Sequence, residues 1–309
     1  MSLAVPPIDS LREAVIDDVT APVAKRMRAI YYLRTMETEE AVKILMVGLN
    51  DKRNSPLLRH ELAYVLGQMR NRIACGTLES VLADKSDDVM VRHECAEALG
   101  AIGASSSKTI LEKFANKADE PIEVKETCEI AHNFIKWKDE GEKGEKPLTC
   151  ACMTTYNSVD PAPASEAENL SVDELGKQLG DESLPLFERY RAMFALRNRG
   201  GDDAAIMLGK VLVEDSSSAL LRHEVAYVLG QMQLPAGANA LAECLKRLNE
   251  HNMVRHEAAE ALGAIVGAEE KCKILLEEFL KDQDDVVRES CEVALDCQDY
   301  WSDLNQLQA

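Results

Sequence analysis

The sequence predicts an all-α protein, a solenoid of helical hairpins divided into two pseudo-symmetric halves. Ala, Leu, Glu and Val are plentiful and only 5% of the residues are aromatic, a composition that favours helices over a β-sandwich. The chain also repeats itself, once at a spacing of 163 residues and again at a spacing of 33. With 46% hydrophobic and 29% charged residues, the 309-residue chain can bury a core and is neither disordered nor fibrous.

The long spacing reflects a duplication of the chain. Residues 57–69 are nearly identical to residues 220–232, and the same offset of 163 maps 90–100 onto 253–263. Because the offset does not slip between these segments, we interpret each half of the chain as one copy of the same unit.

The short spacing divides each half into four repeats. A unit of 33 residues has room for two helices of about 12 residues and two turns, which is typical of HEAT-type helical hairpins. We expect the second helix of a hairpin to begin after Ser55-Pro56 or Asp87-Asp88, where capping residues precede an apolar run. We interpret the residues that carry the spacing as structural, bonding acidic residues between repeats: Arg26, Arg59, Arg92 and Lys125, then Arg189, Arg222, Arg255 and Arg288.

A segment without the repeat pattern joins the halves. It is rich in charge, Gly and Pro, which is typical of a flexible linker. We therefore predict an N-terminal half at 1–136, a linker at 137–168 and a C-terminal half at 169–309, with a linker long enough to let the halves face each other. Trp137 and Trp301 are expected to cap the ends of the two halves.

The charge of the chain and its first residues exclude several functions. A net charge of -19 repels nucleic acid and anionic membrane faces and favours a basic partner. The first seven residues lack the features of a secretory signal, and no stretch reaches the roughly 18 apolar residues that span a bilayer. Nine scattered cysteines do not form a small-domain disulfide framework. We expect a reduced, cytoplasmic monomer that binds neither nucleic acid nor membrane.

Four of the six histidines are followed directly by glutamate. These His-Glu pairs occupy one position in two consecutive repeats of each half, whereas the flanking repeats of the first half carry Met27-Arg28 and Glu126-Thr127 there. Neighbouring helices in such stacks lie about 8–10 Å apart, so imidazoles from two of them can meet at one ion. The competing interpretation is that these are ordinary surface pairs that recur only because the repeat recurs. Four pairs in the central repeats of both halves disfavour this interpretation. The pairs are His60-Glu61, His93-Glu94, His223-Glu224 and His256-Glu257.

Small residues accompany the pairs. A glycine stands seven residues after each histidine, on the same side of the helix. We interpret Gly67, Gly100, Gly230 and Gly263 as clearing bulk from the face that carries the histidines, so that this face borders a cavity. Two histidines and two carboxylates from each half would hold two metal ions with open positions. Such ligands fit non-haem iron best, and their types also suit zinc or manganese.

The pattern resembles the deoxyhypusine hydroxylases, HEAT-repeat proteins with four His-Glu motifs, two in each half, that hold a di-iron centre. The resemblance covers nearly the whole chain. One departure, Glu37-Thr38 in place of the Gly200-Gly201 turn of the second half, lies outside the motifs, and we expect no loss of activity from it. The motifs are Leu-Arg-His-Glu at 58–61 and 221–224, Val-Arg-His-Glu at 91–94 and 254–257, and Arg-Tyr-Arg-Ala-Met-Phe-Ala-Leu-Arg at 189–197.

The resemblance implies a monooxygenase that uses O2 and an external reductant. Its substrate would be the deoxyhypusine side chain on the precursor of translation initiation factor five-A, which becomes hypusine. Glu61 and Glu224 would complete the site, either as ligands or by pairing with substrate amines, since a carboxylate-rich cavity attracts a polyamine-like cation. The resemblance implies two Fe²⁺ ions, whose firmest ligands would be His60, His93, Glu94, His223, His256 and Glu257.

Two other functional classes stay open, and several residues are set aside. The chain could be a HEAT-repeat protein-binding scaffold or a HEAT-like pigment lyase, although neither is expected to carry two His-Glu pairs in each half. His132 and His251 lie outside the pairs and are expected at the surface. Cys150 and Cys152 form a close pair in the linker but lack the further ligands that zinc requires. Cys95, Cys128 and Cys291 are expected to pack in the core.

Overall fold

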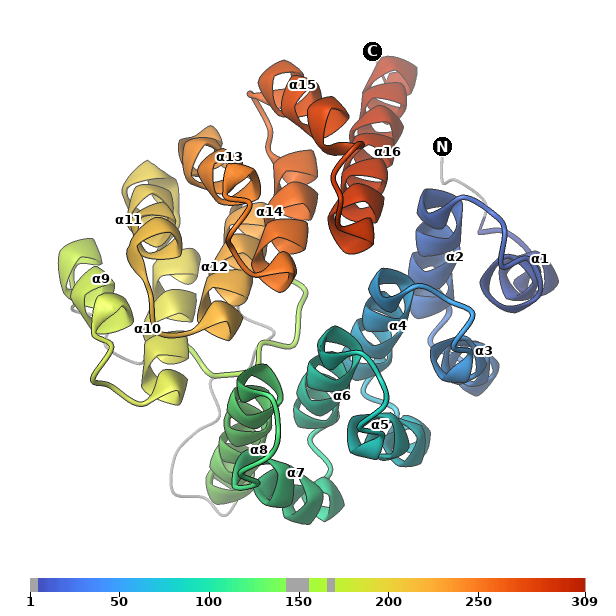
Figure 1. Cartoon of the computed structure of the whole chain (residues 1–309), viewed down its shortest axis with the longest axis horizontal. Helices are drawn as coiled ribbons and strands as arrows, with labels where there is room; N and C mark the ends of the chain where they lie inside the picture. The colour runs from blue at the N-terminus through green and yellow to red at the C-terminus, as the bar shows by residue number, and fades with distance from the viewer. Residues whose placement is uncertain (1–4, 143–155, 166–169, 309) are drawn as a thin grey trace. The chain divides into compact units, whose positions relative to one another are not determined.

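The computed structural model describes residues 5–142, 156–165 and 170–308. Within these residues the regular structure is helical and contains no strand. The chain divides into two compact units (Figure 1): the described part of the first comprises 5–142 and Asn157–Pro161, and that of the second comprises Tyr156, 162–165 and 170–308.

The helices of the first unit alternate between the two members of successive hairpins. They are α1 (Ile8–Arg12), continued by the π-helical turn η1 (Glu13–Asp17), α2 (Val23–Met36), α3 (Glu39–Asn50), α4 (Pro56–Met69), the 3₁₀ turn η2 (Arg72–Ala74), α5 (Cys75–Ala83), α6 (Val89–Ile102), the 3₁₀ turn η3 (Ser105–Ser107), α7 (Lys108–Ala115) and α8 (Ile122–Glu142).

The second unit follows the same order. Its helices are α9 (Val172–Gly180), α10 (Leu186–Arg199), α11 (Gly201–Glu214), α12 (Ala219–Met232), the 3₁₀ turn η5 (Pro235–Gly237), α13 (Ala238–Lys246), α14 (Asn252–Ala264), α15 (Glu269–Phe279) and α16 (Asp285–Gln308). The predicted all-α class is therefore confirmed for the described residues, whereas the division into four repeats per half stays a prediction.

Within each unit the second helices of the hairpins form one layer. In the first unit α4 packs against α2 and α6, and α6 packs against α8; in the second unit α12 packs against α10 and α14, and α14 against α16. Each of these helices also packs against the preceding helix of its own hairpin. A helix in this layer has neighbours on several sides, which explains why α4 is buried on more than one face.

The layer helices begin where the sequence predicts. Ser55 caps α4 by accepting a hydrogen bond from the backbone N–H of Leu58, and Pro56 occupies the first helical position. Asp88 caps α6 by accepting from the N–H of Met90. Each cap satisfies an N–H that the helix itself leaves without an acceptor, a contribution of about 1 kcal/mol.

Arginines tie successive hairpins together at five of the eight positions for which the sequence analysis predicts it. Arg26 donates to the side chain of Asn54 at 2.7 Å, and Arg288 pairs with Asp285 of its own helix. Arg92 donates from Nε to the carbonyl of Leu82 at 2.9 Å and from Nη2 to Glu120 at 2.6 Å. The Leu82 carbonyl lies in the last turn of α5, and carbonyls at a helix C-terminus attract cations. The same position in other repeats forms the pairs Arg59–Asp87, Arg189–Asp215, Arg222–Glu250 and Arg255–Asp282.

The predicted linker contains ordered elements at its start and near its end. Helix α8 continues to Glu142, so it extends into the range 137–168. Further along, the side chain of Gln68 accepts from the N–H of Val159 at 2.8 Å and donates to its carbonyl at 3.3 Å. The backbone N–H of Ser165 donates to the carbonyl of Arg191 at 3.0 Å. The domain boundaries themselves stay a prediction.

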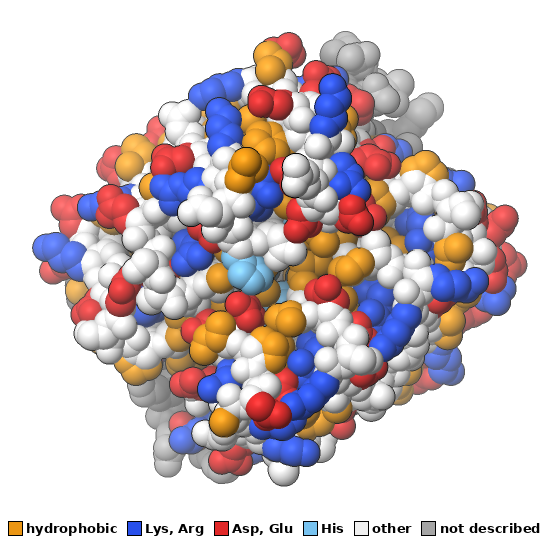
Figure 2. All heavy atoms as spheres, viewed as in Figure 1, with side chains coloured by type: hydrophobic (Ala, Val, Ile, Leu, Met, Phe, Trp, Pro, Cys, Tyr) orange, Lys and Arg blue, Asp and Glu red, His pale blue; other side chains and the backbone are white. Residues whose placement is uncertain are grey.

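The surface carries charges of both signs. Figure 2 shows acidic, basic and hydrophobic side chains interspersed over one face, so the net charge of -19 is not gathered there into a single acidic field. Across the part of the chain that the structure describes, none of the helices combines the length and the apolar character needed to cross a membrane.

Candidate metal centre

The four His-Glu pairs occupy equivalent places in the layer helices. Each histidine is the fifth residue of its helix, in α4, α6, α12 and α14. All eight side chains are buried; the most exposed, Glu257, retains only 7% of its surface. Burying histidine and glutamate together is costly unless they are paired or bind a metal ion. The recurrence of the same burial in four helices therefore indicates a shared function.

In the first unit the pairs of α4 and α6 meet each other. Nε2 of His60 lies 3.2 Å from Oε2 of Glu94, and the ring centroids of His60 and His93 are 5.4 Å apart. One ligand atom from each of His60, His93 and Glu94 can be chosen so that all three lie within 4.8 Å of one another. Atoms this close can become ligands of a single ion after small side-chain movements.

The second unit repeats this geometry. Nε2 of His223 lies 3.4 Å from Oε2 of Glu257, and the ring centroids of His223 and His256 are 5.3 Å apart. The two rings are inclined by 40°, as are those of His60 and His93. In both units the histidine of one pair therefore faces the glutamate of the next pair.

The remaining two glutamates are also buried. Glu61 accepts a hydrogen bond from the hydroxyl of Tyr31 at 2.8 Å through Oε2, and its Oε1 lies 3.3 Å from Nδ1 of His60. Glu224 keeps 2% of its surface. Glu61 thus contacts the side of the His60 ring that is turned away from Glu94.

The carboxylates around His60 change its protonation. Burial opposes the charged imidazolium, but the charge of Glu94 and the hydrogen bonds to Glu61 and Glu94 raise the pKa of His60 well above its ordinary value. A metal ion that binds this nitrogen must displace the proton. Without metal, the proton offsets part of the negative charge of the buried carboxylates.

The glycines that follow the histidines correct one sequence prediction: they do not clear a cavity. A Cβ on Gly67 would lie 2.7 Å from Cα of Ala98 on the next helix, and one on Gly100 would lie 2.8 Å from Cβ of Ala131. Gly230 and Gly263 face the alanines of their own neighbouring helices in the same way. A residue two turns after the histidine lies on the face that meets the next repeat. Glycine there lets successive helices approach closely, which brings each histidine to the following His-Glu pair.

Positions outside the pairs contribute contacts that the sequence analysis did not anticipate. Oε1 of Glu260 lies 3.7 Å from Nδ1 of His256 and accepts from Ser290 at 2.9 Å. A carboxylate beside the second ring nitrogen is a common way to orient a metal-binding histidine. Tyr31 could have been found by comparing the halves, because the duplicate of this residue is Phe194.

The residues set aside in the sequence analysis lie elsewhere. His132 is half-buried on α8, and His251 caps α14 by accepting from the N–H of Met253. The predicted core cysteines Cys95, Cys128 and Cys291 are buried, and burial raises the pKa of the Cys128 and Cys291 thiols to about 12. Trp137 stacks on Phe134 with ring centroids 6.1 Å apart. Cys150, Cys152 and the side chain of Trp301 lie outside the described residues.

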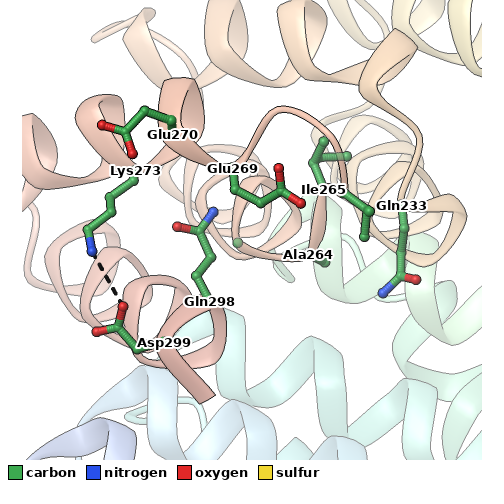
Figure 3. Close-up of a pocket in the computed structure, with 10 residues that line it drawn as sticks. Gln233, Ala264, Ile265, Glu269, Glu270, Lys273, Gln298 and Asp299 are labelled. Carbon is green, nitrogen blue, oxygen red and sulfur yellow. Dashed lines mark hydrogen bonds and ion pairs between the residues drawn. The ribbon is translucent and has the colours of Figure 1, made fainter. Parts of the chain in front are cut away.

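The second unit also has a cavity of about 550 Å³ that is separate from the pairs. It lies between the end of α14 and helices α15 and α16, and Figure 3 shows Lys273 paired across it with Asp299 at 3.4 Å. None of the eight predicted site residues lines this cavity.

The donor set of the pairs fits a transition-metal ion. Imidazole nitrogens combined with carboxylate oxygens suit iron, zinc or manganese, and the grouped atoms of His60, His93 and Glu94 supply this mixture in the first unit. The identity and number of the ions do not follow from donor type alone.

Comparison with known proteins agrees with the fold and with the pattern of pairs. The HEAT-repeat family model matches residues 48–131 and 207–296, which confirms the HEAT-type class. The deoxyhypusine hydroxylase of Danio rerio is 48% identical over 287 residues, covering 93% of this chain and 90% of the relative. That of Homo sapiens is 45% identical over 295 residues, covering 95% of this chain and 91% of the relative.

A solved structure gives the same result. The structure of human deoxyhypusine hydroxylase in complex with glycerol matches with a TM-score of 0.86 and 45% identity, covering 95% of this chain and 96% of the human chain. Relatives at this identity, aligned over nearly their whole length, share the repeats and the fold of this protein. The chain therefore belongs to the deoxyhypusine hydroxylase family.

Proposed function

We propose that this chain hydroxylates the deoxyhypusine side chain of a protein substrate to hypusine, as a monooxygenase that holds two Fe²⁺ ions through its four His-Glu pairs. One observation supports this proposal most directly: in each unit a buried histidine lies 3.2–3.4 Å from the carboxylate of the next pair. Membership of the family supports the reaction itself.

The pairs divide into ligands and substrate-binding groups. We assign His60, His93, Glu94, His223, His256 and Glu257 as iron ligands. His60, His93 and Glu94 offer donor atoms that lie close together. Glu61 instead contacts the hydroxyl of Tyr31 and Nδ1 of His60, the ring nitrogen that does not face Glu94. We therefore assign Glu61, and by duplication Glu224, to pairing with the amines of the substrate. When bound, iron supplies the activation of O2 that a C–H hydroxylation requires.

The residues of the chain then have defined tasks in the reaction. The histidines must be neutral to bind iron, so iron loading releases the proton that His60 holds beside Glu94. Glu61 and Glu224 hold the cationic side chain and so bring its carbon next to the metal ions. The buried setting excludes bulk water, which strengthens these charge contacts.

The substrate protein that we propose is the precursor of translation initiation factor five-A, modified in the cytoplasm by a monomeric enzyme. Deoxyhypusine is a long cation, and a chain of net charge -19 attracts a basic partner. An external reductant is needed because one oxygen atom of O2 enters the product and the other leaves as water.

The test combines metal analysis with a product assay. Purified protein is loaded with Fe²⁺ and incubated with the deoxyhypusine-containing protein, O2 and a reductant, and mass spectrometry detects the gain of one oxygen atom. We expect His60→Ala to lose iron and turnover, and Glu61→Ala to keep iron but bind substrate weakly. His132→Ala, a histidine on α8 outside the pairs, is the matched control. Full iron content and turnover in His60→Ala would contradict the ligand assignment, and a metal-free, inactive wild type would favour a binding scaffold.

A further inference from the structure

Tyr31 reaches the buried carboxylate of Glu61 from a neighbouring helix. It lies on α2, and its hydroxyl donates to Oε2 of Glu61 on α4 at 2.8 Å. The other oxygen, Oε1, lies 3.3 Å from Nδ1 of His60, and Nε2 of the same ring lies 3.2 Å from Glu94. Tyr31 is thus the outer end of a chain of contacts that leads through Glu61 and His60 to Glu94.

The duplication indicates that the fold does not require this hydroxyl. The offset of 163 maps Tyr31 onto Phe194, which is fully buried and packs against Tyr190 with ring centroids 6.3 Å apart. The Tyr31 side chain is instead 40% exposed. In the second half the aromatic ring of Phe194 packs in the core. In the first half the side chain of Tyr31 instead contacts a carboxylate of the candidate site.

A restraint of this kind matters for a glutamate that binds a cation. The terminal torsion of glutamate is broad, so its carboxylate turns unless neighbours hold it. A carboxylate has about four positions that accept hydrogen bonds, so Glu61 can keep its contacts to Tyr31 and His60 and still accept from an ammonium group. An O–H donor to a carboxylate makes one of the stronger hydrogen bonds in proteins.

We propose that Tyr31 is a positioning residue that holds the Glu61 carboxylate in the orientation in which it pairs with an amine of the substrate. The inference rests on the proposed function, because it assumes that Glu61 binds the deoxyhypusine side chain. Phe194 has no hydroxyl, so the second half does not make this particular contact.

The test compares Tyr31→Phe with Tyr32→Phe. Both variants keep an aromatic ring on α2 and remove one hydroxyl, but only the first removes the contact to Glu61. The Fe²⁺-loaded proteins are titrated with the deoxyhypusine-containing protein in the absence of O2, so that the dissociation constant is measured without turnover. We expect Tyr31→Phe to raise Kd and KM about tenfold, the loss that follows from one hydrogen bond to a charged group. Iron per chain stays unchanged and kcat stays within about twofold.

A second comparison shows whether Tyr31 acts through Glu61. In a Glu61→Gln background, adding Tyr31→Phe should change Kd by less than about twofold, because contacting residues are not additive. An unchanged Kd in Tyr31→Phe alone, a tenfold effect that persists beside Glu61→Gln, or a loss of iron would each overturn the positioning role. If the wild type neither takes up iron nor hydroxylates, the proposed function fails and this inference fails with it. A normal wild type with a normal Tyr31→Phe overturns the inference alone.

Discussion

Replacing Gly67 by alanine should weaken both the fold and the metal site of the first unit. The new Cβ would lie 2.7 Å from Cα and 2.9 Å from Cβ of Ala98, whereas carbon atoms in contact are about 3.5–4.0 Å apart. Helices α4 and α6 must therefore separate by about 1 Å. Overpacking of this kind costs about 1–3 kcal/mol, and the better helix propensity of alanine returns about 1 kcal/mol. We expect a net loss of up to about 2 kcal/mol, or up to roughly 8 °C in Tm.

The same separation moves His60 away from Glu94. Their atoms are 3.2 Å apart, and metal ligands must reach their bond lengths within about 0.2 Å. Gly67→Ala should therefore bind Fe²⁺ more weakly, as measured by anaerobic titration, and unfold at lower urea concentration. Gly76→Ala is the control, because no atom lies within 4 Å of its added Cβ; it should leave iron binding unchanged and not lower stability. If Gly67→Ala and Gly76→Ala have the same stability and iron affinity, close helix contact is not what positions the pairs.

Three further predictions concern the scaffold. Gly200 has φ 70° and ψ -172°, a conformation essentially limited to glycine, so Gly200→Ala should lower the free energy of unfolding in urea by about 1–3 kcal/mol. Glu37 occupies the duplicate position with φ 51°, so Glu37→Gly should instead raise the free energy of unfolding by about 1 kcal/mol. Equal effects of the two substitutions would refute the reasoning. Arg255→Leu leaves the carboxylate of Asp282 buried without its arginine and should cost about 3–5 kcal/mol, against less than about 1 kcal/mol for Lys43→Ala in an exposed pair. Burial opposes ionisation of Asp282, but Arg255 lowers the pKa of Asp282 below the ordinary 3.8. The stability that the Arg255–Asp282 pair contributes is therefore fully present above about pH 4 and is lost as the pH falls through the lowered pKa. Urea midpoints measured between pH 7 and pH 3 should drop in acid, and Asp282→Asn should flatten that drop.

Features that depend on periodicity could be predicted from the sequence. The 33-residue spacing located the layer helices, and Ser55 and Asp88 identified helix starts because a cap acts within its own turn. The His-Glu pairs were recognised because their placement departs from that of the flanking repeats. Each of these inferences uses only neighbours along the chain or equivalent positions one repeat away.

Features that depend on the partner across a helix contact could not be predicted in the same way. A glycine on the histidine face is compatible with an open cavity or with a close contact, and only the position of Ala98 against Gly67 distinguishes them. Tyr31 was overlooked because its own repeat has no His-Glu pair, although its replacement by Phe194 in the duplicate was visible. Composition predicted a flexible linker, but Gln68 bonds the backbone of Val159, a contact between residues far apart in the sequence.

The close agreement of the two units argues that the pairs were kept for a reason other than stability. The His–Glu distances of 3.2 and 3.4 Å and the ring separations of 5.4 and 5.3 Å are nearly equal, and the helices that carry the pairs are nearly identical in sequence between the halves. Burying ionisable groups costs several kcal/mol per charge, and apolar residues of similar size would often be more stable. A stack of HEAT hairpins does not need a His-Glu pair at this position, because the flanking repeats of the first half carry Met27-Arg28 and Glu126-Thr127 there. Binding of a metal ion would offset the cost of burial in a way that packing cannot, and the grouped donor atoms of His60, His93 and Glu94 fit such an ion. One difference between the halves, Tyr31 against Phe194, lies next to Glu61, the carboxylate that we assign to the substrate.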